Sequence, residues 1–142
     1  MRTTEPSLAF ALREITGRLM RHLRSVEPAG GLTWSQSALI SRLDRGGEAT
    51  AVALAAAEGI RPQSMGAMLD ALEKEDLIVR RQDPNDRRKL LVSISAHGRE
   101  VIRATRRTRE KWLADAIAER LTEKDRDILR KAVAILERLV DG

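Results

Sequence analysis

The alternation of apolar and polar positions predicts helices over most of the chain. In residues 7–27, apolar side chains recur every three or four positions, which is the period of an amphipathic helix. These side chains are Leu8, Leu12, Ile15, Leu19, Leu23 and Val26. The Pro-Ala-Gly-Gly segment at 28–31 is expected to end this helix.

Capping residues predict where the next two helices begin. Thr33 and Gln36 have the spacing of a capping box and open a helix that the Gly-Gly pair at 46–47 is expected to end. Thr50 is the expected N-cap of a short third helix. We expect Gly59 to end that helix in a left-handed conformation.

A fourth helix is predicted only a few residues later. It opens with Pro62, whose missing N–H is not needed in a first turn, and continues to residue 77. Its buried stripe is expected to be Met65, Met68, Leu69 and Leu72, which leaves Gln63, Ser64, Gly66, Ala67 and Asp70 facing outward. A close helix pair is typical of a helix-turn-helix, whose second helix enters the DNA major groove. Small exposed side chains allow close approach, and Gln63 and Ser64 can hydrogen-bond to bases or phosphates.

The segment LIVRRQDPNDRRKLLVSIS, residues 77–95, has the pattern of a β-hairpin. Apolar and polar positions alternate in both halves, and the Asp-Pro-Asn-Asp segment at 83–86 fits a type I turn. Arg87, Arg88 and Lys89 lie together beside the tip, where their mutual repulsion does not favour folding. A partner of opposite charge is therefore expected. A helix pair followed by a basic hairpin predicts a winged helix-turn-helix.

Two further helices are predicted after the hairpin, with Ser95 and Thr122 as their N-caps. One side of the helix at 96–121 carries Val101, Thr105, Thr108, Trp112, Ala116 and Ile117. The helix at 123–140 has a wide apolar face formed by Leu129, Ala132, Val133, Leu136, Leu139 and Val140. These faces, with that of the first helix, exceed what a small winged-helix core can cover. We therefore expect a two-fold dimer held by both ends of the chain.

Composition and charge narrow the class of function. The 26 Lys and Arg residues against 21 Asp and Glu residues give a formal charge of +5, which favours nucleic acid or an anionic surface as a partner. With no cysteine and two isolated histidines, no metal or other cofactor is expected. No apolar run is long enough to span a membrane and no secretory signal is apparent, so a cytoplasmic protein is expected.

An enzyme would have to use Asp83 and Asp86 as a pair of acid–base carboxylates. Such chemistry needs a desolvated pocket that separates their pKa values, and a tight basic hairpin supplies none. The sequence also lacks a Ser-His-Asp arrangement, a P-loop and a dinucleotide fingerprint. We therefore predict no enzymatic activity.

The order of elements and the stretch LEKEDLIVRRQDPNDRRKLLVSISAHG, residues 72–98, resemble the MarR family of bacterial transcription regulators over nearly the whole chain. The family pattern there is a Leu-Glu pair, a strand, an Asp-x-Arg wing, a second strand and a Thr-x-x-Gly helix start. Leu72, Glu73, Asp86, Arg88 and Gly98 match it. Ser95 replaces the usual Thr and keeps a capping hydroxyl, whereas Asp76 replaces a usual Gly and is expected to alter the turn into the wing.

The resemblance implies a mainly α fold with a small β-hairpin wing. A single domain, residues 1–142, would contain a winged helix-turn-helix at 32–95, here called the reading head, and dimerisation helices at 1–31 and 96–142. It implies a homodimeric repressor that binds double-stranded DNA at a pseudo-palindromic operator and is relieved by a small molecule.

The residues expected to contact DNA are Thr50, Arg61, Pro62, Gln63, Ser64, Ala67, Asp86, Arg87, Arg88 and Lys89. As the arginine of Asp-x-Arg, Arg88 is expected to reach a minor groove, and Asp86 to orient nearby arginines. A narrow A·T-rich minor groove attracts inserted arginine, which agrees with this assignment. The alternatives are a plain turn cap for Asp86 and a solvated charge for Arg88.

Family members commonly respond to small aromatic or phenolic anions that bind between the dimer helices and the reading head. Phe10, Trp34 and Trp112 fall on the first, second and fifth predicted helices, which surround that crevice in the family. A core or interface role for these rings is the alternative. Two other functions also stay open, a protein-interaction module and a winged-helix protein that binds nucleic acid without sequence preference.

Overall fold

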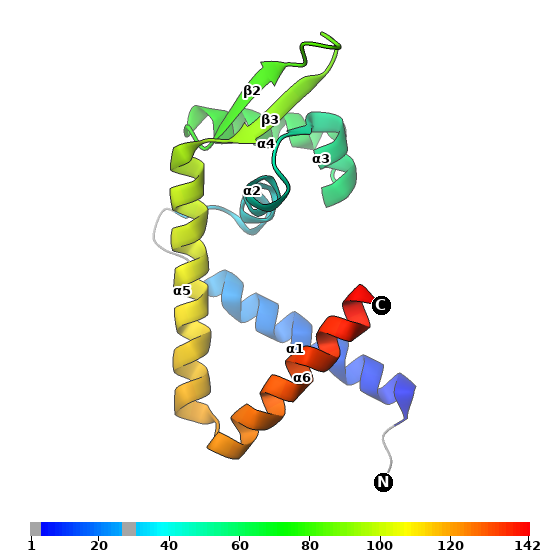
Figure 1. The fold of residues 1–142 in the computed structure, drawn as a ribbon, viewed down its shortest axis with the longest axis vertical. Helices are drawn as coiled ribbons and strands as arrows, with labels where there is room; N and C mark the ends of the chain where they lie inside the picture. The colour runs from blue at the N-terminus through cyan, green and yellow to red at the C-terminus, as the bar shows by residue number, and fades with distance from the viewer. Residues whose placement is uncertain (1–3, 27–30) are drawn as a thin grey trace.

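The computed structural model describes residues 4–26 and 31–142. Within them the order is α1 (Glu5–Ser25), α2 (Trp34–Gly46), β1 (Ala49–Thr50), α3 (Ala51–Glu58), α4 (Pro62–Lys74), β2 (Ile78–Gln82), β3 (Leu90–Ile94), α5 (Ala96–Arg120) and α6 (Glu123–Asp141). Helix α5 runs along the molecule, with the reading head at its N-terminal end and α1 and α6 beside its other half (Figure 1). The fold is therefore a mainly helical winged helix-turn-helix on a long helical stem.

The predicted helix caps are confirmed. In α2, the Thr33 N–H donates to Gln36 Oε1 at 3.0 Å and the Gln36 N–H donates to Thr33 Oγ1 at 3.2 Å, which completes the capping box. Gly59 ends α3 with φ 63° and ψ 33°, the left-handed conformation expected of it. Ser95 caps α5 by accepting the Gly98 N–H at 2.9 Å, and Thr122 caps α6. These bonds join residues at most three positions apart.

The predicted bounds of the first helix were displaced. Helix α1 begins at Glu5, because Thr4 accepts the Ser7 N–H and Pro6 fits the first turn, and it ends at Ser25 rather than at 27. The glycine-containing segment predicted to stop it, at 28–31, lies mostly outside the described residues.

The predicted end of the fourth helix, at residue 77, was wrong. Helix α4 ends at Lys74 in a Schellman motif, in which the Leu77 N–H donates to the Leu72 carbonyl and the Asp76 N–H to the Glu73 carbonyl, both at 3.0 Å. Asp76 has φ 58°, in the left-handed region that glycine favours. The aspartate therefore keeps the turn that glycine would make, and the expected alteration is not seen.

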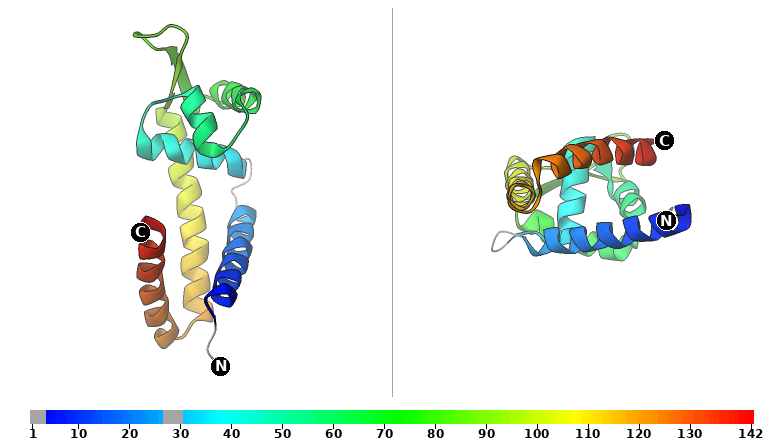
Figure 2. Two further views of the ribbon diagram at one scale, coloured as in Figure 1. Left: turned by 90° about the vertical axis from the view of Figure 1, so that its right-hand side faces the viewer. Right: turned by 90° about the horizontal axis from the view of Figure 1, so that it is seen from below.

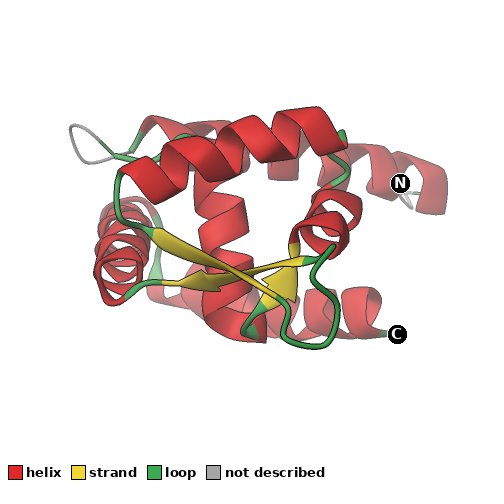
Figure 3. Ribbon diagram, turned by 90° about the horizontal axis from the view of Figure 1, so that it is seen from above, coloured by secondary structure: helices red, strands yellow, loops and turns green. Residues whose placement is uncertain are grey.

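The sheet has one strand more than predicted. Its order is β1-β3-β2, all antiparallel, with Ala49 paired to Val92 and Thr50 to Leu91 (Figure 3). Two residues are too few to show an alternating pattern, so β1 was missed.

The hydrogen-bonded turn in the wing was also misplaced, because the Lys89 N–H donates to the Asp86 carbonyl at 2.9 Å and sets a turn at 86–89. Asp83 instead accepts the Asn85 N–H with its side chain.

The hydrophobic core lies in the reading head and extends into the start of α5. Its most buried side chains are Leu39, Ile40, Leu43, Leu54, Met65, Leu69, Leu72, Val92 and Ile102. Gly98 lets α5 pack against the start of β2, because a Cβ there would lie 2.1 Å from the Leu77 carbonyl oxygen. No other residue fits this position without moving backbone, so Gly98 sets how α5 leaves the sheet.

Helices α1 and α6 contribute little to this core. Figure 2 shows them on either side of the lower half of α5. Leu23 of α1 is buried, whereas α6 buries no residue. The apolar side chains left exposed on them are Leu8, Phe10, Ile15, Leu19, Ile128, Leu129, Val133, Ile135, Leu136, Leu139 and Val140. Within the described residues, no helix is both long and apolar enough to cross a membrane.

Candidate nucleic-acid interface

The recognition helix α4 exposes the residues predicted to meet DNA. Gln63, Ser64 and Ala67 are exposed, whereas Met65, Leu69 and Leu72 are buried in the core. The predicted division holds less well at Gly66 and Met68, both of which are partly buried. The start of the helix is accessible as well, because Arg61 and Pro62 are exposed and the Arg61 side chain makes no capping hydrogen bond.

Thr50 connects the helix-turn-helix to the wing. Its hydroxyl accepts the Ala53 N–H at 3.1 Å and so caps α3, while its backbone pairs with β3. Thr50, Val52, Arg88 and Leu90 are among the residues that line a hollow of about 500 Å³ between α3 and the wing. The structure thus brings Thr50 together with two of the predicted wing residues, Arg88 and Lys89.

The wing tip presents three cationic side chains to solvent. Arg87, Arg88 and Lys89 are all exposed, and the Arg88 side chain is 92% accessible. Asp86 Oδ1 accepts the Arg88 backbone N–H at 3.1 Å and lies 3.2 Å from Arg88 Nε. Asp86 therefore acts both as a turn cap and as a partner that orients Arg88.

Two further arginines at the base of the wing were not among the predicted site residues. Arg80 bonds to Glu73 and Asp70 of α4, whereas Arg81 bonds to Glu48, which precedes β1. The hydrogen bond from Arg80 holds the pKa of Glu73 below its ordinary value. A signal was present, because residues 80 and 81 face opposite sides of a strand and acidic residues lie on the preceding helix.

The three aromatic residues have different surroundings in the single chain. Phe10 is 61% exposed on α1. The Trp112 ring stacks on His22, with centroids 5.8 Å apart and an interplanar angle of 14°. The guanidinium groups of Arg24 and Arg109 both lie over the Trp34 ring, at 4.8 and 4.6 Å from its centroid. The assignment of Phe10, Trp34 and Trp112 to a ligand site therefore stays a prediction.

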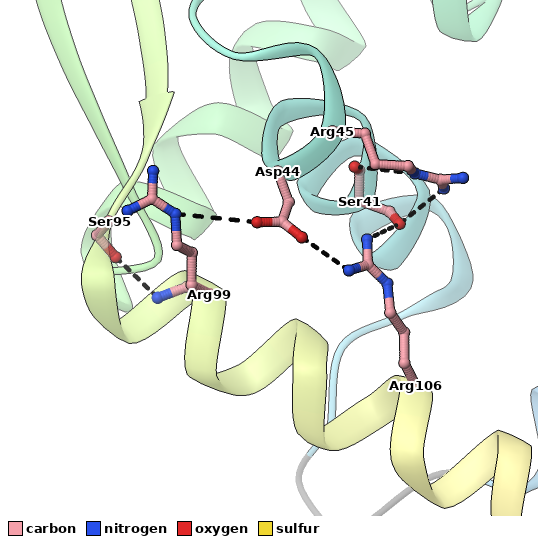
Figure 4. Close-up of polar contacts among 7 residues, drawn as sticks. Ser41, Asp44, Arg45, Ser95, Arg99 and Arg106 are labelled. Atoms are coloured by element: carbon pink, nitrogen blue, oxygen red, sulfur yellow. Dashed lines mark hydrogen bonds and ion pairs between the residues drawn. The ribbon is translucent and has the colours of Figure 1, made fainter.

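Trp34 alone of these residues lines a hollow between α2 and α5. The volume is about 270 Å³, and its lining includes Met20, Ser37, Ser41, Arg45, Ile102 and Arg106. The Ser37 hydroxyl is buried and has no hydrogen-bond partner among the described residues. Arg106 donates to Ser41 Oγ and to Asp44 Oδ2, as Figure 4 shows. The lining of the hollow thus combines the aromatic ring of Trp34 with the basic side chains of Arg45 and Arg106.

Comparisons with known proteins agree with this geometry. Residues 32–90 match the model of the MarR family. An uncharacterized HTH-type transcriptional regulator of Mycobacterium bovis is 37% identical over 141 residues, which cover 99% of this chain and 98% of that protein. A transcriptional regulator protein from Pseudomonas aeruginosa has a TM-score of 0.83 and 34% identity, covering 99% of both chains.

A mutant of MarR from E. coli, solved in complex with operator DNA, shares the fold. Its TM-score is 0.65 with 19% identity, covering 91% of this chain and 92% of that chain. The fold, the exposed basic wing and the relatives lead to one conclusion. This chain belongs to the MarR family and is a DNA-binding transcription regulator of the winged helix-turn-helix type.

Proposed function

We propose that this regulator is a homodimeric repressor that binds a pseudo-palindromic operator. The observation that carries the proposal is the exposed apolar surface of α1 and α6, at the end of the molecule away from the reading head (Figure 1). A second copy packed on these faces would remove them from water. A two-fold dimer would also present two recognition helices to successive major grooves. On this proposal, segments 1–31 and 96–142 form the dimerisation part.

Within each reading head, we assign α4 to a major groove and the wing to the neighbouring minor groove. The exposure of Gln63, Ser64 and Ala67 supports the first assignment, since an amide and a hydroxyl can read base edges where small neighbours allow close approach. The cations of residues 87–89, exposed and oriented in part by Asp86, support the second. Thr50, Arg61 and Pro62 border this surface, where they would face the phosphate backbone.

We further propose that a small aromatic or phenolic anion relieves repression by binding in the hollow beside Trp34. The indole offers a stacking surface, and Arg45 and Arg106 supply positive charge. The buried Ser37 hydroxyl offers an unused hydrogen-bonding group. Because Asp44 already pairs with Arg106, the anion of a ligand would compete with Asp44 for that arginine. Such competition would loosen the contact between α2 and α5.

Because its target is DNA, we expect the protein to act in the cytoplasm. Repression by occupancy of an operator requires no chemical step, so neither enzymatic activity nor a cofactor is part of the proposal.

The experiment is a fluorescence anisotropy titration with the DNA that flanks the protein's own gene, against a scrambled duplex of equal length. We expect one dimer per operator and a preference for the specific duplex of about 1,000-fold or more. Equal affinity for both duplexes would instead identify a non-specific nucleic-acid-binding protein. Absence of binding to either duplex at low salt would favour a protein-interaction module.

A further inference from the structure

One arginine joins the base of the wing to the recognition helix. Arg80 is the third residue of β2, and its Nη2 atom lies 2.7 Å from Asp70 Oδ1 and 3.1 Å from Glu73 Oε1. Its Nε atom lies 3.0 Å from Glu73 Oε2. Both carboxylates belong to α4 and lie nearly one turn apart. Arg80, Asp70 and Glu73, here called the Arg80 cluster, thus connect the two elements assigned to DNA.

The cluster has the geometry of a strong and directional contact. Glu73 receives two parallel hydrogen bonds from the guanidinium fork, an arrangement that a lysine cannot reproduce. The Arg80 side chain is only 20% exposed, so solvent screens it less than the arginines of the wing tip. Hydrogen bonds within the cluster lower the pKa of Glu73 and raise the pKa of Arg80, so both groups stay charged at neutral pH.

The cluster also offsets negative charge on the recognition helix. Asp70 is exposed on α4, on the side that was predicted to face outward with Gln63 and Ala67. An unpaired carboxylate there would repel DNA phosphates. Arg80 pairs with Asp70 from β2, without using the cations of residues 87–89.

The neighbouring arginine shows that this contact is specific to one side of the strand. Arg81 donates from Nη2 to Glu48 Oε1 at 2.8 Å and from Nε to Glu48 Oε2 at 3.2 Å. Successive residues of a strand face opposite sides, so Arg81 holds the wing to the loop before β1 and leaves α4 to Arg80. Of these two arginines, only Arg80 forms ion pairs with the recognition helix.

We propose that Arg80 is a positioning residue for DNA binding. It holds the wing in the orientation in which residues 87–89 reach the minor groove while α4 occupies the major groove. This inference rests on the proposed function, because it requires that the wing contact DNA. A wing that is already held in place loses little conformational entropy when it binds DNA. A mobile wing loses more, and its binding is weaker by that amount.

The test combines substitutions at the cluster and at the wing tip. Binding to the operator duplex is measured for Arg80→Met, Arg88→Ala and the double variant. If the wing is loosely held, its tip contributes less to operator binding. The fold-loss of operator affinity caused by Arg88→Ala should therefore be about tenfold smaller in the Arg80→Met background than in wild type. The loss caused by Gln63→Ala should be equal in both backgrounds, because the core holds α4 in place.

Two further variants separate positioning from a general loss of charge or stability. Arg42 pairs with Glu58 between α2 and α3, so Arg42→Met removes a comparable ion pair that does not involve the wing, and its effect should be independent of Arg88→Ala. Arg80→Lys keeps the charge but loses the fork, and it should reduce the effect of Arg88→Ala as Arg80→Met does. If thermal melts show that Arg80→Met does not fold, the Lys variant takes its place in the cycle.

The outcomes are distinct. If the fold-losses of Arg80→Met and Arg88→Ala simply multiply, Arg80 does not position the wing. If Arg80→Met lowers the salt slope by about one per subunit and the losses multiply, Arg80 contacts a phosphate directly and the inference is wrong. If Arg88→Ala alone leaves binding unchanged, the proposed wing contact fails and the role of Arg80 fails with it. If Arg88→Ala weakens binding strongly but the two fold-losses multiply, the inference about Arg80 is wrong and the proposed wing contact with DNA is kept.

Discussion

Asp44 Oδ2 lies 2.7 Å from Arg106 Nη1, and this ion pair joins α2 of the reading head to the middle of α5. Figure 4 shows that Arg99, two turns earlier on α5, approaches the other carboxylate oxygen, at 3.8 Å. The Asp44 side chain is only 11% exposed. One carboxylate near the end of α2 thus contacts two turns of the helix that leads to the proposed dimer interface.

We expect Asp44→Asn to lower the melting temperature at neutral pH, because it removes the charge that Arg106 and Arg99 face. The Arg106 hydrogen bond holds the pKa of Asp44 below its ordinary value. A carboxylate whose pKa is lowered by folding stabilises the protein above its unfolded pKa, and that stabilisation is lost as the pH falls through the folded pKa. The difference from wild type should therefore be full near pH 7 and shrink below about pH 4.

Calorimetric melts across this pH range measure the Asp44 effect. Asp127→Asn is the matched control. Asp127 and Arg130 form an exposed ion pair on α6, and exposed pairs contribute little to the free energy of unfolding. A difference between wild type and Asp44→Asn that is as large near pH 3 as near pH 7 would show that the ion pair is not its source.

Changing Leu136 and Leu139 together to Asp should convert the dimer to monomers. Both side chains are exposed on α6 in the single chain, and a dimer that covers them would have to bury two unpaired charges per subunit. That burial costs several kcal/mol, on the order of the affinity of many dimers. Light scattering at micromolar concentration measures the oligomeric state. Lys131→Asp with Arg138→Asp, two exposed polar positions on the same helix, should leave the dimer intact. A Leu136/Leu139 variant that stays dimeric would place the interface elsewhere.

Gln63→Ala should weaken binding to the preferred operator by roughly 1 to 3 kcal/mol and relax the preference at one base position. The exposed amide can pair with adenine through one donor and one acceptor, and alanine retains neither. Anisotropy titrations against single-base variants of the operator measure this effect. An equal loss on specific and scrambled duplexes would assign Gln63 to the backbone instead of to a base.

Arg88→Ala should weaken binding to many duplexes and lower the magnitude of the salt slope by about one per subunit. The reason is that its exposed guanidinium adds charge to a groove flanked by phosphates. Titrations from low to high salt, with circular dichroism as a check on folding, measure it. Unchanged affinity and slope would mean that the cations at 87–89 form only a solvated turn.

A small aromatic carboxylate should weaken operator binding, and operator DNA should weaken the binding of that carboxylate by the same factor, because coupling is reciprocal. Benzoate is a suitable probe, with tryptophan fluorescence reporting on the hollow beside Trp34. Trp112→Phe removes the second tryptophan, which lies outside the lining of that hollow, and should leave the benzoate response in place. Equal benzoate affinity with and without operator would exclude this mechanism.

Interactions between near neighbours in the chain were readable from the sequence. The Thr33 and Gln36 capping box, the left-handed Gly59 and the Ser95 cap each involve residues within a few positions of one another. The exposed face of α4 was predicted from the helical spacing of its apolar residues. These residues mark the buried side of the helix, so the opposite side is the exposed one. The wing was predicted because alternating residues and a turn are local as well.

Features that depend on two distant segments were missed or misplaced. Strand β1 exists because residues 49–50 meet β3, more than 40 positions later, so its own two residues carry no signal. The turn moved to 86–89 because the Lys89 carbonyl accepts the Asp83 N–H across the hairpin while the Lys89 N–H bonds to Asp86. Helix α4 ends before residue 77 in its Schellman motif, and Leu77 is then buried in the core, where its carbonyl oxygen lies close to Gly98 on α5.

The sequence by itself determined the existence of the helices, the capping residues and the basic wing, because propensity, periodicity and charge act along the chain. The family was indicated separately, by the resemblance of the motif at residues 72–98. Tertiary structure alone decided the partners of charged side chains. Nothing in the sequence pairs Asp44 with Arg106, which is 62 positions away. Strand alternation puts Arg80 and Arg81 on opposite sides of β2, but only the packing of the strand decides which of them meets the recognition helix. Such pairs are set by how helices and strands pack, since an ion pair forms only where the backbone brings its two charges within reach.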